Sequence, residues 1–427
     1  MERDKINDLI IWKNKYNRKP LIVNGARQVG KSWLIRHFGK IHFKNQIVEI
    51  NLERSKNLHT IFQQDFNITR IIFELNLALD LTIIPNKTLL FIDEIQACPE
   101  ALGCLRYFYE DMPELHIIVA GSLLDFEFRN QPFPVGRVEI MNMYPMTFLE
   151  FLKARSKTNL VQLLQTPFAD VPENIAHYFE NDFMLYLIVG GMPECVKHFT
   201  ETDDLLGVKS IQDNLLYSYE QDFKKYQPNI NADCLLDILE NGTKFIGNQI
   251  IYTKLSQRFT SPTVKKGVDV LRTARLLHSV PNVSVGNLPL TSSGKQFKLF
   301  FLDVGLLLRK SGLEYQSLYI KKELSVAFQG MLSEQFVAQQ LIVQTEQKTF
   351  YWARTESGAS SEVDFVILKD NKIIPIEVKS GKSGSLKSLH YLLNNNPTIE
   401  KAIVFSQAKR GSVEKIDFIP IYWAGRC

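Results

Sequence analysis

The segment PLIVNGARQVGKSWLIRHFG, residues 20–39, decides the fold of the first part of the chain. Its apolar start indicates a buried strand, and its last residues have the pattern of a helix. Between them, GARQVGKS at residues 25–32 fits the pattern G-x4-G-K-[ST] completely. A strand, a glycine-rich loop and a helix in this order are typical of a phosphate-binding loop. A glycine turn that fits by chance is the alternative, and the strand and helix around it speak against it.

The residue types of this loop suit a nucleoside triphosphate. Gly25 and Gly30 allow backbone angles and a close approach that side chains would block. The loop amides and the helix start can cradle phosphates. Lys31 adds a positive charge at the β- and γ-phosphates, and Ser32 offers a hydroxyl ligand to Mg²⁺. We therefore expect ATP and Mg²⁺ as cofactors, with a nucleotide-binding set of Gly25, Ala26, Arg27, Gln28, Val29, Gly30, Lys31 and Ser32.

Hydrolysis needs a second, acidic element, and TLLFIDEIQ at residues 88–96 has its pattern. Asp93 ends a buried strand, where it is placed to bind Mg²⁺ through water. Glu94 is placed to orient and deprotonate the attacking water. Acids are also common at solvated strand ends, but a phosphate loop about 60 residues earlier favours the catalytic interpretation.

Two further residues are candidates for the same site. Ser122 ends the next apolar strand, HIIVAGS, where a polar sensor of the γ-phosphate would lie; a plain turn is the alternative. Arg137 in VGRVEI is a candidate arginine finger that reaches the nucleotide of a neighbouring subunit, and an ordinary surface arginine is the alternative.

The first third of the chain alternates strand and helix patterns. Near-continuous apolar runs predict strands buried on both faces at 20–25, 46–52, 88–95 and 116–122. Helix patterns lie between them at 32–39, 58–80 and 99–110. This alternation predicts an α/β fold with a parallel sheet and helices on both sides.

Composition narrows the class of protein. The chain has 427 residues, of which 45% are hydrophobic and 22% charged, so a globular protein of several domains is expected rather than disorder. Five scattered cysteines without a Cys-x2-Cys pair argue against a zinc ribbon or a disulfide framework. No apolar run approaches the roughly 20 residues of a membrane helix. We expect a cytoplasmic protein without a membrane partner.

Near the other end, EVDFVILKDNKIIPIEVKSG, residues 362–381, predicts a hairpin with unexpected charges. Glu377 and Lys379 are two apart and share one strand face, and Asp364 lies in the preceding strand. Upstream, a predicted helix at 325–345 carries Glu334 as the only charge in an apolar stripe of Ala327, Met331, Ala338 and Leu341. A buried carboxylate needs a metal or a cation.

The order Glu, Asp, Glu-x-Lys resembles the PD-(D/E)XK nuclease superfamily, with Glu334 as the helix acid. The resemblance implies that Asp364 and Glu377, with Glu334, hold Mg²⁺ through oxygen ligands. It also implies that Lys379 orients the water that attacks a phosphodiester. The alternative is a salt-bridged hairpin on a solvated sheet face, because cross-strand charge pairs are common.

A basic helix pattern lies between these two regions. SPTVKKGVDVLRTARLL at 261–277 starts with a helix signal, and its apolar stripe is Val264, Val268, Leu271 and Leu276. Basic side chains project off that stripe: Lys265, Lys266, Arg272 and Arg275. With the helix before it and the strands after it, the segment predicts a winged helix. Contact with DNA is one interpretation; a solvated face or a protein contact is the other.

Taken together, GARQVGKS, FIDEIQ, AGS, GR…YPMTFLEFL and GGMPE resemble bacterial and archaeal AAA-type ATPases that carry a restriction-endonuclease-like C-terminal domain. The resemblance covers essentially the whole chain. It implies a P-loop NTPase core at 1–155, a helical lid at 156–228, a winged-helix domain at 229–310 and a nuclease-like α/β domain at 311–427. One departure concerns Ser122: the group commonly has Gly-Ser-Ser-Ser there, whereas this chain has GSLL at 121–124.

The sequence thus predicts an Mg²⁺/ATP-dependent ATPase coupled to a nuclease-like domain that binds nucleic acid, DNA above all, and has the residues to cleave it. The alternative is a nucleotide-dependent switch whose nuclease-like domain binds DNA or a protein without cleavage. A non-nucleolytic regulator of a defence or toxin system is a third hypothesis. A homo-oligomeric ring is the habit of the superfamily, and Arg137 by itself does not establish one.

Overall fold

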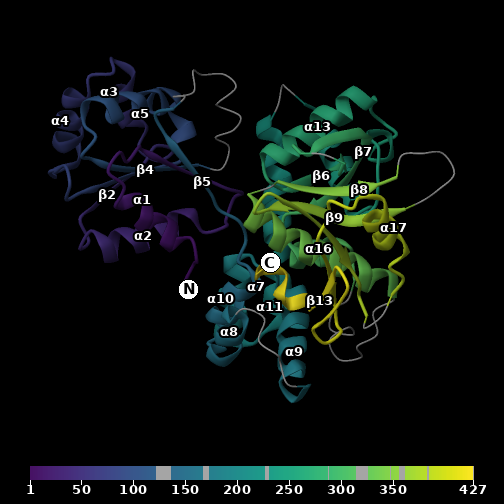
Figure 1. The fold of residues 1–427 in the computed structure, drawn as a ribbon. Coiled ribbons are helices and arrows are strands. Elements are labelled where there is room, and N and C mark those ends of the chain that lie inside the picture. Colours follow the sequence, from purple (N-terminus) through teal and green to yellow (C-terminus); the bar gives the residue numbers. More distant parts are fainter. Residues whose placement is uncertain are drawn as a thin grey trace. The chain divides into compact units, whose positions relative to one another are not determined.

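The computed structural model describes residues 1–121, 136–166, 173–226, 230–286, 288–313, 326–346, 348–354, 361–381 and 384–426. The chain divides into two compact units, residues 2–144 and residues 145–427 (Figure 1). In the described part of the chain, no helix is both long enough and apolar enough to cross a membrane. The described cysteines Cys98, Cys104, Cys195 and Cys234 are free and buried.

The first unit contains the predicted parallel sheet. Its described strands have the order β2-β3-β4-β1-β5, and every pair is parallel. Four of them match the apolar runs of the sequence: β1 (Leu21–Asn24), β2 (Ile47–Asn51), β3 (Leu89–Asp93) and β4 (His116–Gly121). The edge strand β5 (Glu139–Asn142) was not predicted. Because all five run the same way, β1 and β3 end at the same edge of the sheet, which is where the predicted nucleotide site lies.

Helices cover both sides of this sheet. In Figure 1, α1 (Ile6–Lys13) and α2 (Lys31–His42) lie on one side, and α3 (His59–Gln63), α4 (Ile68–Leu79) and α5 (Pro99–Asp111) lie on the other. The helix predicted at 58–80 is two helices. Asn67 starts the second one, because its side chain accepts a hydrogen bond from the backbone N–H of Arg70 and so caps α4.

The second unit is built on one mixed sheet. Its described strands have the order β12-β13-β11-β10-β9-β8-β6-β7. Their bounds are β6 (Leu277–Ser284), β7 (Thr291–Phe301), β8 (Thr349–Ala353), β9 (Glu362–Lys369), β10 (Lys372–Val378), β11 (Ala402–Ser406), β12 (Gly411–Val413) and β13 (Ile416–Pro420). The predicted hairpin at 362–381 is confirmed as the antiparallel pair β9–β10.

The hairpin β6–β7 joins the same sheet through the parallel neighbours β6 and β8, which pair at Asn282 and Tyr351. The side chain of Asn282 strengthens this junction by accepting a hydrogen bond from the N–H of Ala353 at 2.9 Å. The segments predicted as a winged helix and as a nuclease-like domain therefore share one sheet. The predicted boundaries at residues 156, 229 and 311 stay predictions.

The helices of the second unit come mostly before this sheet in the chain. They are α7 (Phe148–Ala154), α8 (Thr158–Gln165), α9 (Glu173–Val189), α10 (Pro193–Thr202), α11 (Leu205–Asp222), α12 (Ala232–Lys244), α13 (Ser261–Thr273), α14 (Val304–Lys310), α16 (Val326–Thr345) and α17 (Lys387–Asn395). Helices α12 and α13 pack on each other and precede the hairpin β6–β7, which is the order that a winged helix requires.

Helix α16 is buried although it carries several polar side chains. Gln335 accepts a hydrogen bond from the N–H of Phe301 and donates one to its carbonyl, at 2.8 and 2.9 Å. One turn later, Gln339 accepts from the N–H of Val304 at 2.9 Å. These amides satisfy backbone groups where β7 ends and α14 begins, so α16 holds that junction by hydrogen bonds as well as by apolar packing.

The GGMPE segment at 190–194 contains a break between α9 and α10 that closes around Asp303. Gly190 has a φ of 74°, and a Cβ there would lie 2.0 Å from the Oδ1 of Asp303. The N–H of Gly191 donates to the Oδ2 of Asp303 at 2.6 Å. Asp303 also caps α14 by accepting from the N–H of Leu306. Burial raises the pKa of Asp303, and the backbone donors partly offset that cost.

We predict that Gly190→Ala destabilises the second unit by about 2–5 kcal/mol, because the new methyl group enters the space of Asp303 and a left-handed φ disfavours alanine. The measurement is the midpoint of urea unfolding of the full chain. Gly330→Ala in α16 is the matched control, since a Cβ there has no described atom within 4 Å; it should be neutral or stabilise by up to about 1 kcal/mol. Equal midpoints for the two variants would contradict the prediction.

Candidate functional site

The phosphate loop connects the end of β1 to the start of α2, as predicted. Gly30 precedes α2 with a φ of 92°, a left-handed angle that favours glycine. Gly25 is required for another reason: a Cβ there would lie 2.4 Å from the carbonyl oxygen of Met143, just after β5. The close approach of the backbone that follows β5, a strand that the sequence did not predict, therefore requires glycine at position 25.

Lys31 is buried at the first position of α2. Its ammonium donates hydrogen bonds to the carbonyl oxygens of Gly25 at 2.8 Å and Ala26 at 2.9 Å. The positive charge is thereby held inside the loop. Because the α2 amides and this ammonium face the same loop, the arrangement suits an anion such as a polyphosphate.

The predicted Mg²⁺ ligands lie together. The hydroxyl of Ser32 donates to the Oδ2 of Asp93 at 2.9 Å, although the two residues are 61 positions apart. They meet because Ser32 follows β1 and Asp93 ends β3, and both strands end at the same sheet edge. A hydroxyl and a carboxylate are hard oxygen donors that suit Mg²⁺ held mainly by phosphates and water.

Glu94 directly follows β3 in a left-handed conformation, with a φ of 50°. Its carboxylate accepts a hydrogen bond from the side-chain amide of Gln96 at 2.5 Å. Sequence reasoning missed this orienting residue, although Gln96 stands in the FIDEIQ segment itself. A carboxylate oriented in this way beside Asp93 is positioned to act on a water near the loop.

Arg137 lies away from its own phosphate loop. It precedes β5, whose Glu139 pairs with Leu21 at the start of β1. The loop follows the other end of β1, roughly 13 Å further along at 3.3 Å per residue. The Nε of Arg137 donates to Glu110 at 2.8 Å. A finger that acts on a neighbouring copy stays a prediction, and the predicted sensor Ser122 lies outside the described residues.

The charges of the hairpin β9–β10 belong to a cluster centred on a residue that was not predicted. Lys298 of β7 is fully buried, and its ammonium pairs with Glu334 at 3.5 Å and with Asp364 at 3.3 Å. It also pairs with Glu362, two residues before Asp364 on the same strand face. A single lysine in the apolar run FKLFF, residues 297–301, is the sequence signal that could have identified it.

Burial alone would lower the pKa of Lys298, but Glu334, Asp364 and Glu362 together raise it well above its usual value. Burial and the neighbouring Asp364 carboxylate raise the pKa of Glu334, and Lys298 partly offsets this shift. Gly247 allows the acid to approach, since a Cβ there would lie 2.5 Å from Glu334. The cluster therefore holds the buried Lys298 as a cation.

Glu377 and Lys379 lie beside this cluster. Lys379 donates to the Oε1 of Glu377 at 2.6 Å, and burial followed by the charge of Asp364 raises the pKa of Glu377. The N–H of Val378 donates to the other Asp364 oxygen at 2.8 Å. Within the described residues, no three His, Cys, Asp or Glu side chains gather in a metal-binding arrangement. The metal-ligand role of Glu334, Asp364 and Glu377 stays a prediction. The ion pairs of Lys298 with Glu334 and Asp364 argue against it.

The basic helix agrees with its pattern only in part. Val264, Val268 and Leu271 are buried along α13, and Lys265 and Lys266 are exposed. The helix ends at Thr273, so Leu276 and Arg275 lie beyond it, and Arg275 has a positive φ of 61°. Arg272 pairs with Asp269 at 3.2 Å. Of the four predicted basic residues, Lys265 and Lys266 are the two that are exposed on the helix without an ion pair to another described residue.

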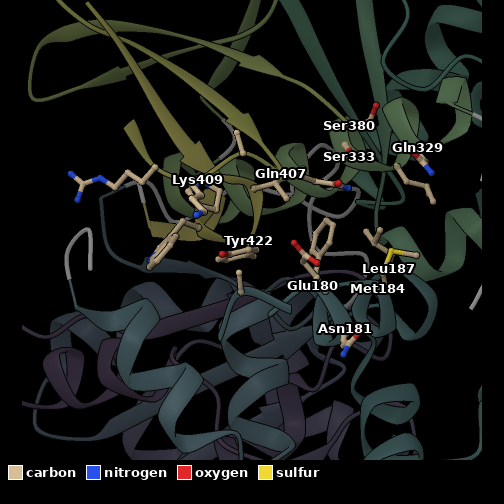
Figure 2. A pocket seen from close by; sticks show the side chains of 18 residues that line it. Glu180, Asn181, Met184, Leu187, Gln329, Ser333, Ser380, Gln407, Lys409 and Tyr422 are labelled. Carbon is tan, nitrogen blue, oxygen red and sulfur yellow. The ribbon is translucent and has the colours of Figure 1, made fainter. Parts of the chain in front are cut away.

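A cavity of about 420 Å³ lies in the second unit (Figure 2). Tyr422 lines it and stacks on Phe179 with ring centroids 4.6 Å apart, and burial together with the Glu180 carboxylate raises the pKa of Tyr422. Ser333 and Ser380 also line the cavity. The lining mixes apolar side chains such as Met184 and Leu187 with polar and charged ones such as Gln407 and Lys409.

Three family models match parts of the chain. Residues 17–152 match an AAA domain (AAA_14). The first unit is an AAA-type P-loop ATPase domain. Residues 180–317 and 329–423 match two domains of unknown function, DUF8612 and DUF4143. Neither description names a nuclease or a winged helix. No curated protein matches the chain in sequence.

Several solved structures resemble parts of the chain. A Walker-type ATPase of Pyrococcus abyssi is 15% identical over 73% of this chain and 95% of its own, with a TM-score of 0.45. The RuvB Holliday junction branch migration motor of Thermotoga maritima is 14% identical over 66% and 90%, with a TM-score of 0.31. Drosophila ORC bound to DNA is 11% identical over 72% and 93%, with a TM-score of 0.30. Similarities at these TM-scores carry no functional argument for this chain.

We predict that Arg137→Ala lowers the rate of ATP hydrolysis by about 10³-fold, as the loss of an arginine finger does. The measurement is phosphate release over a range of protein concentrations, because a finger in trans acts only in assembled copies. Glu110→Gln is the matched control, since it removes the ion-pair partner and keeps the arginine. Wild-type rates in both variants would assign Arg137 to the surface alone.

Proposed function

We propose that the first unit binds and hydrolyses ATP with Mg²⁺, and that the second unit uses the resulting change of state to bind nucleic acid. The observation that supports hydrolysis is the hydrogen bond between Ser32 and Asp93. It brings together the loop hydroxyl and the strand-end acid, two oxygen donors of the kind that Mg²⁺ takes. A chance glycine turn would have no reason to meet the carboxylate of a distant strand.

In this proposal the residues divide the work of phosphoryl transfer. The loop amides and Lys31 would hold the β- and γ-phosphates, and Ser32 and Asp93 would hold Mg²⁺, which when bound would offset charge on the phosphate oxygens. Glu94, oriented by Gln96, accepts a proton from the water that attacks the γ-phosphate. The bond between the β–γ bridging oxygen and the γ-phosphorus breaks, so that ADP and inorganic phosphate leave.

We expect Lys31→Ala to weaken ATP binding and to lower hydrolysis at least 10²-fold, because it removes the charge that faces the phosphates. Glu94→Gln should bind ATP normally and lose about 10²–10⁴-fold in hydrolysis, because the amide accepts no proton. Binding is measured with a fluorescent ATP analogue and hydrolysis by phosphate release. Lys40→Ala, an exposed lysine of the same helix, is the control. Wild-type hydrolysis by Lys31→Ala would remove the basis of the proposal.

For the second unit, the geometry favours a nuclease-like domain that binds nucleic acid without cutting it. The observation behind this choice is the ammonium of Lys298 between Glu334 and Asp364, two residues that a nuclease of the PD-(D/E)XK type would need for a metal. The exposed Lys265 and Lys266 on α13 support contact with a phosphate backbone through a winged helix. A cleaving nuclease remains the competing hypothesis.

We predict that Lys265→Glu/Lys266→Glu weakens DNA binding about tenfold or more and lowers the salt dependence of the affinity by about two phosphate contacts. Fluorescence anisotropy with a DNA duplex, at several salt concentrations and with or without ATP, measures this. Lys197→Glu/Lys372→Glu makes the same charge change away from α13 and should have less effect.

Cleavage is assayed on the same DNA, on single strands and on RNA, with Mg²⁺ or Mn²⁺. We expect no cleavage that depends on Asp364 or Lys379. Cutting by the wild type that Asp364→Ala and Lys379→Ala both abolish would show a working nuclease and overturn the non-cutting choice. Cutting that survives both substitutions would come from a contaminant.

A further inference from the structure

The side chain of Lys298 is a fully buried charge in the second unit. The side chain is 0% exposed and extends from β7 under the ring of Tyr351, 5.6 Å from its centroid. Removing an ammonium from water costs several kcal/mol unless carboxylates compensate it. Three carboxylates do so here, and they come from two separate elements: Glu334 from α16, and Glu362 and Asp364 from β9.

Most other oxygens of these acids already have donors. Asp364 uses its second oxygen for the N–H of Val378 at 2.8 Å, and Glu362 accepts from the side-chain amide of Gln249 at 2.6 Å. Lys379 occupies one oxygen of Glu377. Among the described residues of the cluster, the Oε2 of Glu377 is a buried oxygen with no hydrogen-bond partner. Mg²⁺ in proteins keeps several waters and takes one or two carboxylates, and Glu334 and Asp364 are already paired with Lys298.

These residues do not fit a resident divalent cation. Glu334 and Asp364 would have to release the same ammonium, whose third carboxylate partner among the described residues is Glu362. A divalent ion placed between them would also lie a few ångströms from a buried positive charge, which repels it. Glu334 and Asp364 are therefore already paired with a cation that belongs to the chain.

We infer that Lys298 is an internal replacement for the metal: its ammonium takes the position where a nuclease of this type would hold a divalent ion. The inference rests on the nuclease-like character proposed for the second unit and deepens it, because it names the group that blocks metal chemistry there. It also assigns the acids a structural task. They tie the hairpin β6–β7, which follows the basic helix α13, to α16 and β9.

The test uses the full chain without nucleotide or nucleic acid, and Mn²⁺ binding followed by electron paramagnetic resonance. Wild type and Asp364→Ala should bind Mn²⁺ equally, because neither holds the ion in the cluster. Lys298→Met removes the ammonium and keeps a side chain of similar length. This variant should therefore gain a Mn²⁺ site that depends on Asp364. Its thermal midpoint should fall without Mn²⁺ and rise when Mn²⁺ is added.

Lys298→Arg is the matched control: it keeps a cation and should gain no site. Lys298→Met/Asp364→Ala should lose the gained site. Wild type that binds more Mn²⁺ than Asp364→Ala would overturn the inference, even if Lys298→Met does not fold, and so would a folded Lys298→Met without a new site. A wild-type protein that does not hydrolyse ATP or does not bind DNA would contradict the proposed function. The Mn²⁺ measurements would still test the inference about Lys298.

Discussion

A charge that leaves water needs a counter-charge a few ångströms away, and this constraint organises the second unit around Lys298. The ammonium comes from β7, and its partners Glu334 and Asp364 come from α16 and β9. These elements lie far apart in the chain, so the ion pairs join segments that the sequence presents as separate domains. The same pairs bring together the acids that resemble a nuclease site. The ion pairs that hold these elements together therefore also determine the electrostatics of the acids.

Asp303 is another buried charge, and backbone N–H groups stabilise its carboxylate. It is fully buried, and it accepts hydrogen bonds from the N–H groups of Gly191 and Leu306. Backbone donors stabilise the carboxylate only if the chain comes very close, which is why Gly190 has no room for a Cβ. The GGMPE segment is thus explained by packing around a buried acid, and it needs no catalytic role in this structure.

The nucleotide site of the first unit depends on strand direction. Because the described strands are all parallel, the residues that follow β1 and β3 meet at one edge, and Ser32 reaches Asp93 there. Short-range hydrogen bonds then orient individual side chains, such as the bond from the amide of Gln96 to the carboxylate of Glu94.

The sequence by itself determined what rests on local patterns. The phosphate loop, the strand that ends in Asp93, and the hairpin that carries Asp364 each lie within a few dozen residues of continuous signal, and periodicity and turn residues suffice to find them. Only the tertiary structure decided which distant side chains meet. Nothing near Gly25 announces that Met143 will pack on it, and nothing near Asp364 announces Lys298, 66 positions earlier. A contact between such residues depends on how strands are ordered in a sheet, and that order has no local signature.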